Sequence, residues 1–201
     1  KTLVEICYLL SNSSSTQQPA LSSSHAILTD MSTMITKYHN YDDGYIALAN
    51  IRLKNTPDKL LINGNELYKK SEFHISIMAV VELAPLLDPE DIERASELLK
   101  QDFLDFVATN DMTQFTLTGE YRLVTRDDRM TLVAMVDLQG IEELFEYLRR
   151  KYYIDFPTQP THITLYTLQP GAGIGILSRE ELENDSVSVE IPELQQLKIG
   201  T

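Results

Sequence analysis

Apolar and polar residues form regular patterns along the chain from residue 45 onward, and these patterns predict six β-strands. Polar residues that are typical of turns lie between some of these strands. Asn63-Gly64 falls in a predicted loop or tight hairpin over Pro57–Asn65, and Asp127-Asp128 is a predicted turn. The predicted strands are Tyr45–Leu53, Phe73–Val81, Phe115–Leu123, Met130–Val136, Thr161–Thr167 and Val187–Ile191.

Apolar residues at three- and four-residue spacing predict two amphipathic helices, Asp88–Ala108 and Leu138–Tyr152. The first is expected to start with Asp88 as N-cap and Pro89 in the first helical position. A shorter helix is expected after Ser178, because Ser178-Arg-Glu-Glu has the capping-box spacing. Helices and strands that alternate, with hairpins mixed in, predict an α+β fold.

Residues 1–44 differ in composition from the rest of the chain. Ser11–Ser24 is rich in Ser, Gln and Thr and is predicted to be a linker or an exposed loop. Ala26–Tyr38 is predicted to form a short helix. We therefore expect an N-terminal extension over residues 1–44 and a folded domain over residues 45–201.

Charge and composition narrow the function classes. With 17 basic and 30 acidic side chains the formal net charge is −13, which argues against binding of long nucleic acid but not against a small phosphorylated ligand. No apolar run approaches the ~20 residues that a transmembrane helix needs. The single cysteine, Cys7, excludes an intramolecular disulfide and a multi-cysteine zinc site, and favours a reducing, cytoplasmic location.

A short pattern occurs twice in the chain. Phe73-His-Ile-Ser and Thr161-His-Ile-Thr each place a histidine in a predicted strand, with a hydroxyl residue two positions later. Since side chains two apart in a strand share a face, His74 and Ser76 project together, as do His162 and Thr164.

Two imidazoles and two hydroxyls that converge on one cleft suit phosphoryl chemistry. Histidines titrate near neutrality, so one can act as general base and the other as general acid. Hydroxyls can donate hydrogen bonds to non-bridging phosphate oxygens. Two histidines without an accompanying Cys, Asp or Glu at the same motif form a weak metal-ligand set, so no metal site is predicted.

These residues resemble the paired His-x-Thr/Ser motifs of the two-histidine (2H) phosphoesterases. The resemblance covers roughly residues 45–199, and Pro160-Thr-His-Ile-Thr-Leu is especially close to the second motif, while the first motif has Ser where Thr is commoner. It implies a bilobal fold, in which two pseudo-repeated sheet-plus-helix lobes surround a central cleft. It also implies cofactor-free catalysis by His74, His162, Ser76 and Thr164, with His74 as the acid and His162 as the base on a 2′,3′-cyclic end.

Other residues are candidates for contacts with the substrate. Tyr166 would share a strand face with His162 and Thr164, where it would stack on a base or contact phosphate, with core packing as the equal alternative. The glycine-rich segment Gln169–Gly175 lacks the Lys-Ser/Thr ending of a phosphate loop and is either a lid or specificity loop or a simple connector. The cations available for phosphate are Lys69, Lys70, Arg122, Arg126 and Arg129.

Two hypotheses follow. The first is a metal-independent phosphodiesterase that hydrolyses a cyclic phosphate or a small nucleotide phosphodiester. The second is a non-catalytic module that keeps the cleft and binds a nucleotide or a protein. The expected partner is a small nucleotide or RNA end rather than long nucleic acid or a membrane. The sequence does not distinguish RNA 2′,3′-cyclic ends, ADP-ribose cyclic phosphate and cyclic oligonucleotide signals as substrates, and it leaves the oligomeric state undefined.

Overall fold

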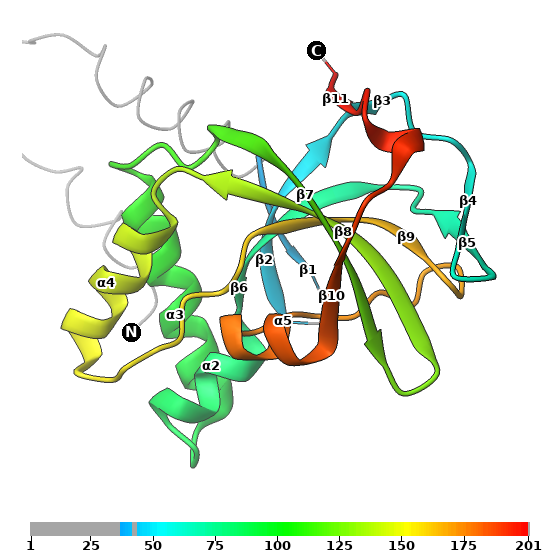
Figure 1. The fold of residues 1–201 in the computed structure, drawn as a ribbon. Helices are drawn as coiled ribbons and strands as arrows, with labels where there is room; N and C mark the ends of the chain where they lie inside the picture. The colour runs from blue at the N-terminus through cyan, green and yellow to red at the C-terminus, as the bar shows by residue number, and fades with distance from the viewer. Residues whose placement is uncertain (1–36, 42–43, 201) are drawn as a thin grey trace, which may run out of the picture. The chain divides into compact units, whose positions relative to one another are not determined.

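The computed structural model describes residues 37–41 and 44–200. Within them lie four α-helices and a mainly antiparallel β-structure (Figure 1), so the predicted α+β class is confirmed. The predicted Ser11–Ser24 linker and most of the predicted Ala26–Tyr38 helix lie outside these residues. No helix in the described part of the chain is both long enough and apolar enough to cross a membrane.

The main sheet has nine strands, and all its registered pairs are antiparallel. Its path runs β1-β2-β6-β9-β8-β7-β10, and the β4–β5 hairpin joins through β5 to β9. A second sheet pairs β3 with β11. The strands are β1 Tyr38–Tyr41, β2 Tyr45–Ile51, β3 Leu53–Lys54, β4 Lys59–Ile62, β5 Asn65–Lys69, β6 Phe73–Ala79, β7 Phe115–Arg126, β8 Arg129–Leu138, β9 His162–Thr167, β10 Ser186–Val189 and β11 Lys198–Ile199.

Both predicted hairpin turns are confirmed. Asn63 and Gly64 have φ angles of 51° and 81°, as the two central residues of a two-residue hairpin turn require, and they join β4 to β5. Asp127 has a φ of 56° in the two-residue turn between β7 and β8. Asparagine and aspartate tolerate this left-handed conformation better than other non-glycine residues, which explains their positions.

The helices are α2 Val80–Leu87, α3 Ile92–Val107, α4 Ile141–Tyr152 and α5 Arg179–Asp185, followed by the 3₁₀-helix η1 Pro192–Leu194. The predicted start of the first amphipathic helix at Asp88 is wrong. Asp88 accepts hydrogen bonds from the amides of Glu90 and Asp91 in a preceding turn, and the N-cap is Asp91, whose carboxylate accepts from the Arg94 amide at 3.1 Å. The predicted Ser178 cap of α5 is confirmed, with its hydroxyl accepting from the Glu181 amide at 3.1 Å.

Helix α2 was not predicted. The apolar run from Phe73 was expected to continue as a strand to Val81, but the strand ends at Ala79 and a helix begins at Val80. The Val81 amide donates to the carbonyl of Gly44 rather than to a neighbouring strand. A continuous apolar run has no period that separates a buried strand from a buried helix, so the sequence pattern missed this change.

The two faces of the main sheet carry different hydrophobic clusters. The larger cluster joins Leu99 and Phe103 of α3, and Leu144 of α4, to strand residues such as Ile75 and Ile163. The smaller cluster joins Val124 and Val133 of β7 and β8 to Ile174, Ile176 and Leu182. Helices α3 and α4 therefore pack on one face, while α5 and the segment before it pack on the other.

Strand β1 lies within the predicted N-terminal extension. It pairs with β2, and Tyr38 packs edge-on against Phe103 at a ring-centroid distance of 5.1 Å. Tyr38 is thus part of a strand and not the end of the predicted Ala26–Tyr38 helix. The sheet therefore begins before residue 45.

Candidate functional site

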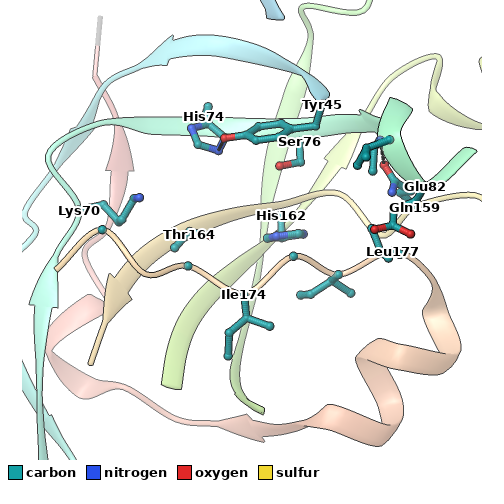
Figure 2. Close-up of a pocket in the computed structure, with 16 residues that line it drawn as sticks. Tyr45, Lys70, His74, Ser76, Glu82, Gln159, His162, Thr164, Ile174 and Leu177 are labelled. Atoms are coloured by element: carbon teal, nitrogen blue, oxygen red, sulfur yellow. Dashed lines mark hydrogen bonds between the residues drawn. The ribbon is translucent and has the colours of Figure 1, made fainter. Parts of the chain in front are cut away.

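The two repeated motifs lie side by side at the middle of the main sheet. Strands β6 and β9 are joined by one registered antiparallel pair, Ile75 with Ile163, and both of these side chains are fully buried. Antiparallel pairing at these central residues sets His74 opposite Thr164 and Ser76 opposite His162 (Figure 2). The two motifs are thus related by an approximate local twofold axis between the isoleucines.

The four motif side chains line one cavity of about 330 Å³. His74, Ser76, His162 and Thr164 all contribute to its wall. Because the intervening Ile75 and Ile163 enter the core on the opposite face, the period of two in each strand directs both histidines and both hydroxyls into this cavity. The structure therefore brings all four predicted catalytic residues together.

A β-bulge follows the hydroxyl residue in each motif. On β6 the pairing with β2 skips Ile77, and on β9 the pairing with β8 skips Leu165. Beyond a bulge, each side chain points to the opposite face of the sheet from the one that regular alternation would give it. The same irregularity at equivalent positions makes the two motifs alike in backbone as well as in sequence.

The bulge at Leu165 explains why Tyr166 does not line the cavity. Tyr166 pairs with Leu132 in the larger core cluster, is fully buried and does not line the cavity. Its hydroxyl donates to the carbonyl of Pro57 at 2.8 Å, and burial raises its pKa to about 12. The structure therefore places Tyr166 in the core, where the core-packing alternative put it, and not beside His162 and Thr164 on the cavity wall.

His162 is held in one tautomer by the chain beside it. Its Nδ1 lies 2.9 Å from the carbonyl oxygen of Pro160, which can only accept, so Nδ1 carries the proton. Nε2 is then the unprotonated nitrogen of the neutral ring. Only 4% of the residue is exposed, and this desolvation lowers its pKa despite the opposing effect of the Pro160 carbonyl. Burial therefore favours the neutral form of His162, in which Nε2 can accept a hydrogen bond or a proton.

His74 has a different environment. It is partly exposed, and its Nε2 lies 3.4 Å from the hydroxyl of Tyr45 on β2. The planes of the Tyr45 and His74 rings meet at 39°, and the ring centroids lie 5.5 Å apart. Tyr45 also lines the cavity, so this aromatic side chain lies beside both the imidazole and the space that a substrate would occupy.

The two ends of the cavity carry different polar groups. Figure 2 shows Lys70 at the end near His74 and Thr164, and Glu82 at the other end near Gln159. Gln159 is buried, and its Oε1 accepts from the Ala79 amide at 2.7 Å, which ties the segment before β9 to the end of β6. Lys70 is the one cationic side chain among the described residues that line the cavity, and it can hold a phosphate.

The arginines predicted as candidate phosphate ligands have other partners. Arg122 contacts Glu120 at 3.0 Å and Glu183 at 3.1 Å, and Arg126 contacts Asp185 at 2.6 Å. The pairs with Glu183 and Asp185 join β7 to α5, and the Asp185 hydrogen bond is the main cause of the raised pKa of Arg126. Lys69 pairs with Asp58 at 2.5 Å, and neither it nor Arg129 lines the cavity.

Sequence reasoning missed Tyr45, Gln159 and Glu82 as cavity residues. Tyr45 opens a predicted strand, and only the pairing of β2 with β6 brings it to His74. Gln159 had a usable signal, since it is a polar residue three positions before His162. Among the described residues, no group of three or more His, Cys, Asp or Glu side chains is arranged to hold a metal ion.

Comparison of the chain with protein-family models, with curated proteins and with solved structures finds no match. The site offers a buried imidazole, a second imidazole that contacts a tyrosine, two hydroxyl donors and one ammonium group around a small cavity. These groups can move protons and bind a phosphate.

Proposed function

We propose that the protein is a metal-independent phosphodiesterase of the two-histidine type, which hydrolyses a 2′,3′-cyclic phosphate or a small nucleotide phosphodiester. The observation that carries the proposal is the pairing of Ile75 with Ile163. It sets a His-x-Ser and a His-x-Thr motif opposite each other on one cavity.

The proposal includes the finer architecture that the sequence resemblance implies. In this view β1, β2 and β6 belong to one lobe, and β9, β8, β7 and β10 belong to the other, with the cleft at their junction. Two features support it: β6 and β9 share a single registered pair, and each motif strand carries a bulge at the equivalent position.

The proposed mechanism divides the proton transfers between the histidines. Nε2 of His162 takes a proton from a water molecule, whose oxygen attacks the phosphorus. The bond from phosphorus to the leaving ribose oxygen breaks, and His74 in its protonated form gives that oxygen a proton. The ring of His162 suits the role of base because burial lowers its pKa, and the Pro160 carbonyl keeps the proton on Nδ1.

The hydroxyls and the ammonium group stabilise the charge on phosphate. Ser76 and Thr164 donate to the non-bridging oxygens, where negative charge develops in the transition state. Lys70, at the end of the cavity, attracts the same group electrostatically. Because the whole chain has a formal net charge of −13, this single local cation favours a small nucleotide or an RNA end over a long polymer, and we propose a cytoplasmic setting for the protein.

The test is turnover of a substrate panel by the purified full chain in EDTA. The panel contains nucleoside and oligoribonucleotide 2′,3′-cyclic phosphates, ADP-ribose cyclic phosphate and cyclic dinucleotides. We expect at least one compound to be hydrolysed, with the rate unchanged by the chelator. Activity that disappears in EDTA and returns with zinc or manganese would contradict the mechanism. Tight nucleotide binding without turnover of any compound would instead identify the non-catalytic binding module.

A further inference from the structure

The segment Gly171–Leu177, here called the glycine loop, forms much of the cavity wall that is not contributed by β6 and β9. All of its residues except Ala172 line the cavity. Residue burial alternates from Gly173 to Leu177, with Ile174 and Ile176 buried and Gly173, Gly175 and Leu177 more exposed. This period of two is that of an extended chain.

The loop is anchored rather than free. Ile174 and Ile176 are 2% and 4% exposed, and they pack with Val124, Val133 and Leu182 in the smaller core cluster. In Figure 2 the Ile174 side chain points away from His162 and Thr164. At the end of the loop, the Leu177 amide donates to the Glu181 carboxylate at 2.9 Å. The other side of the loop therefore faces the cavity with its main chain in a fixed position.

Folding does not explain why residues 173 and 175 are glycines. A Cβ atom at either position would meet nothing within 4 Å, and neither residue has a left-handed φ angle. Other glycines are explained by the fold: Gly171 has a φ of 84°, and a Cβ at Gly44 would lie 2.8 Å from Val81. The remaining reason to omit a side chain at 173 and 175 is to let a ligand approach the backbone closely.

The main chain between these glycines also has unused hydrogen-bonding capacity. Within residues 37–41 and 44–200, the amides of Ile174, Gly175 and Ile176 donate to no backbone carbonyl, and the carbonyls of Gly173 and Gly175 accept from no backbone amide. Buried backbone groups normally find a partner, and Ile174 and Ile176 are buried residues. Along the edge of an extended segment, amide donors alternate with carbonyl acceptors. They therefore do not all point at one anion, as the amides of an anion-binding turn do.

We propose that the glycine loop is the base-recognition element of the cavity, and that the edge of a nucleobase pairs with the main chain of residues 173–176. Nucleobases are flat and carry neighbouring donors and acceptors on one edge, which matches an extended main chain bordered by glycines. The cavity volume of about 330 Å³ suits a ligand of mononucleotide size better than an added peptide strand. This assignment rests on the proposed function, because the phosphate of the same ligand would lie at the histidines.

The kinetic test compares Gly175→Val, which fills the open space, with Ala172→Val, a matched loop variant outside the cavity lining. The substrates are a nucleoside 2′,3′-cyclic phosphate and methyl riboside 2′,3′-cyclic phosphate, which has no base. Gly175→Val should lose about tenfold more kcat/KM on the nucleoside substrate than on the base-free one, mainly through KM, as expected when buried hydrogen bonds to a ligand are lost. Ala172→Val should show no such difference. Equal losses of Gly175→Val on both substrates would overturn the assignment.

A binding test separates this inference from the proposed activity. Nucleoside 3′-monophosphates are titrated into ¹⁵N-labelled His162→Ala protein, and the amide resonances of Gly173 and Gly175 are followed. We expect both resonances to shift, and a Gly175→Ala variant, with circular dichroism to verify folding, to bind more weakly. Shifts without any turnover by the unmodified protein would refute the proposed phosphodiesterase activity but support base recognition by the glycine loop. Turnover without shifts would refute the base site alone.

Discussion

The two motif strands, β6 and β9, share a His-Ile-Ser/Thr pattern but hold their histidines in different surroundings. His162 is 4% exposed, and its Nδ1 is engaged by the Pro160 carbonyl at 2.9 Å. His74 is partly exposed, and its Nε2 lies 3.4 Å from a tyrosine hydroxyl. Both strands have a bulge after the hydroxyl residue, but the pairing of β6 with β2 has a second irregularity that skips His74, whereas His162 pairs in register with Met135 of β8. The two histidines therefore differ in strand pairing as well as in the elements packed around them.

Two strands with the same short motif therefore do not form a symmetric site. Desolvation lowers the pKa of His162 and favours its neutral form, which is what a general base requires. His74 is the more exposed of the two histidines, and in the proposed mechanism it gives the proton to the leaving group. In that mechanism, the different roles of the two histidines would follow from their burial and contacts and not from the motifs themselves.

The largest effect should come from removal of either imidazole. We expect His74→Ala and His162→Ala each to lower kcat by ~10²–10⁴, the usual contribution of a positioned acid or base. His39→Ala, on β1 and outside the cavity lining, is the matched control. Steady-state kinetics on the best substrate of the panel measure the effect. Full activity in a folded His→Ala variant would refute acid–base catalysis by that residue.

Removal of the hydroxyls should have the next largest effect. Ser76→Ala and Thr164→Ala each delete one hydrogen bond to a charged phosphate, worth ~1.5–3 kcal/mol, so kcat/KM should fall about ten- to a hundredfold. Thr116→Ala, on β7 and outside the cavity lining, provides the control. Similar losses in the two variants would support the local twofold arrangement. A loss in only one would mean that a single motif binds the phosphate.

The pH dependence should report the burial of His162. Since its pKa is lowered, the acidic limb of kcat/KM should lie below the ordinary histidine value of about 6.5, as activity falls only when this ring becomes protonated. Protonation also favours unfolding, because the unfolded histidine binds its proton at a higher pH. The free energy of unfolding should therefore decrease as the pH falls from about 6.5 toward the folded pKa.

Urea unfolding at a series of pH values, with His162→Gln as comparison, measures the stability effect. NMR titration of the ring measures the pKa directly. The variant should lack the histidine-dependent part of the acid sensitivity. An ordinary or raised pKa for His162 would contradict the assignment of this residue as the base.

The smallest effect is expected at Tyr166. Tyr166→Phe removes the hydrogen bond to the Pro57 carbonyl and should lower the free energy of unfolding by ~0.5–1.5 kcal/mol. Because the side chain is buried in the core and does not line the cavity, kcat/KM should stay within about twofold of the unmodified protein. Chemical denaturation and kinetics test both parts. A marked increase in KM would contradict this expectation and indicate that Tyr166 contacts the substrate.

Local periodicity was sufficient to predict much of the fold and the shared face of each motif. The amphipathic stripe of α3 and the alternation in β7 and β8 depend on neighbours in sequence, and the same holds for the faces of His74 and Ser76. The face of Tyr166 could not be predicted, because the bulge at Leu165 exists only relative to the register of β8.

The parts that sequence could not predict depend on tertiary contacts. Tyr45 reaches the cavity through the register of β2 with β6, and Gln159 through its hydrogen bond to Ala79. The start of α3 moved from Asp88 to Asp91 because both aspartates suit an N-cap, and the chain uses the first in a turn. The sequence also could not show whether Arg122 and Arg126 bind a phosphate or form ion pairs, and in the structure they pair with carboxylates of α5.

The pairing of Ile75 with Ile163 has the self-complementary form of a contact between two identical subunits across a twofold axis. A chain with a single His-x-Ser/Thr strand could build the same cavity as a homodimer, but both of its histidines would then occupy equivalent environments. A single polypeptide that carries both motifs is free of that constraint, so one histidine is buried while the other is partly exposed.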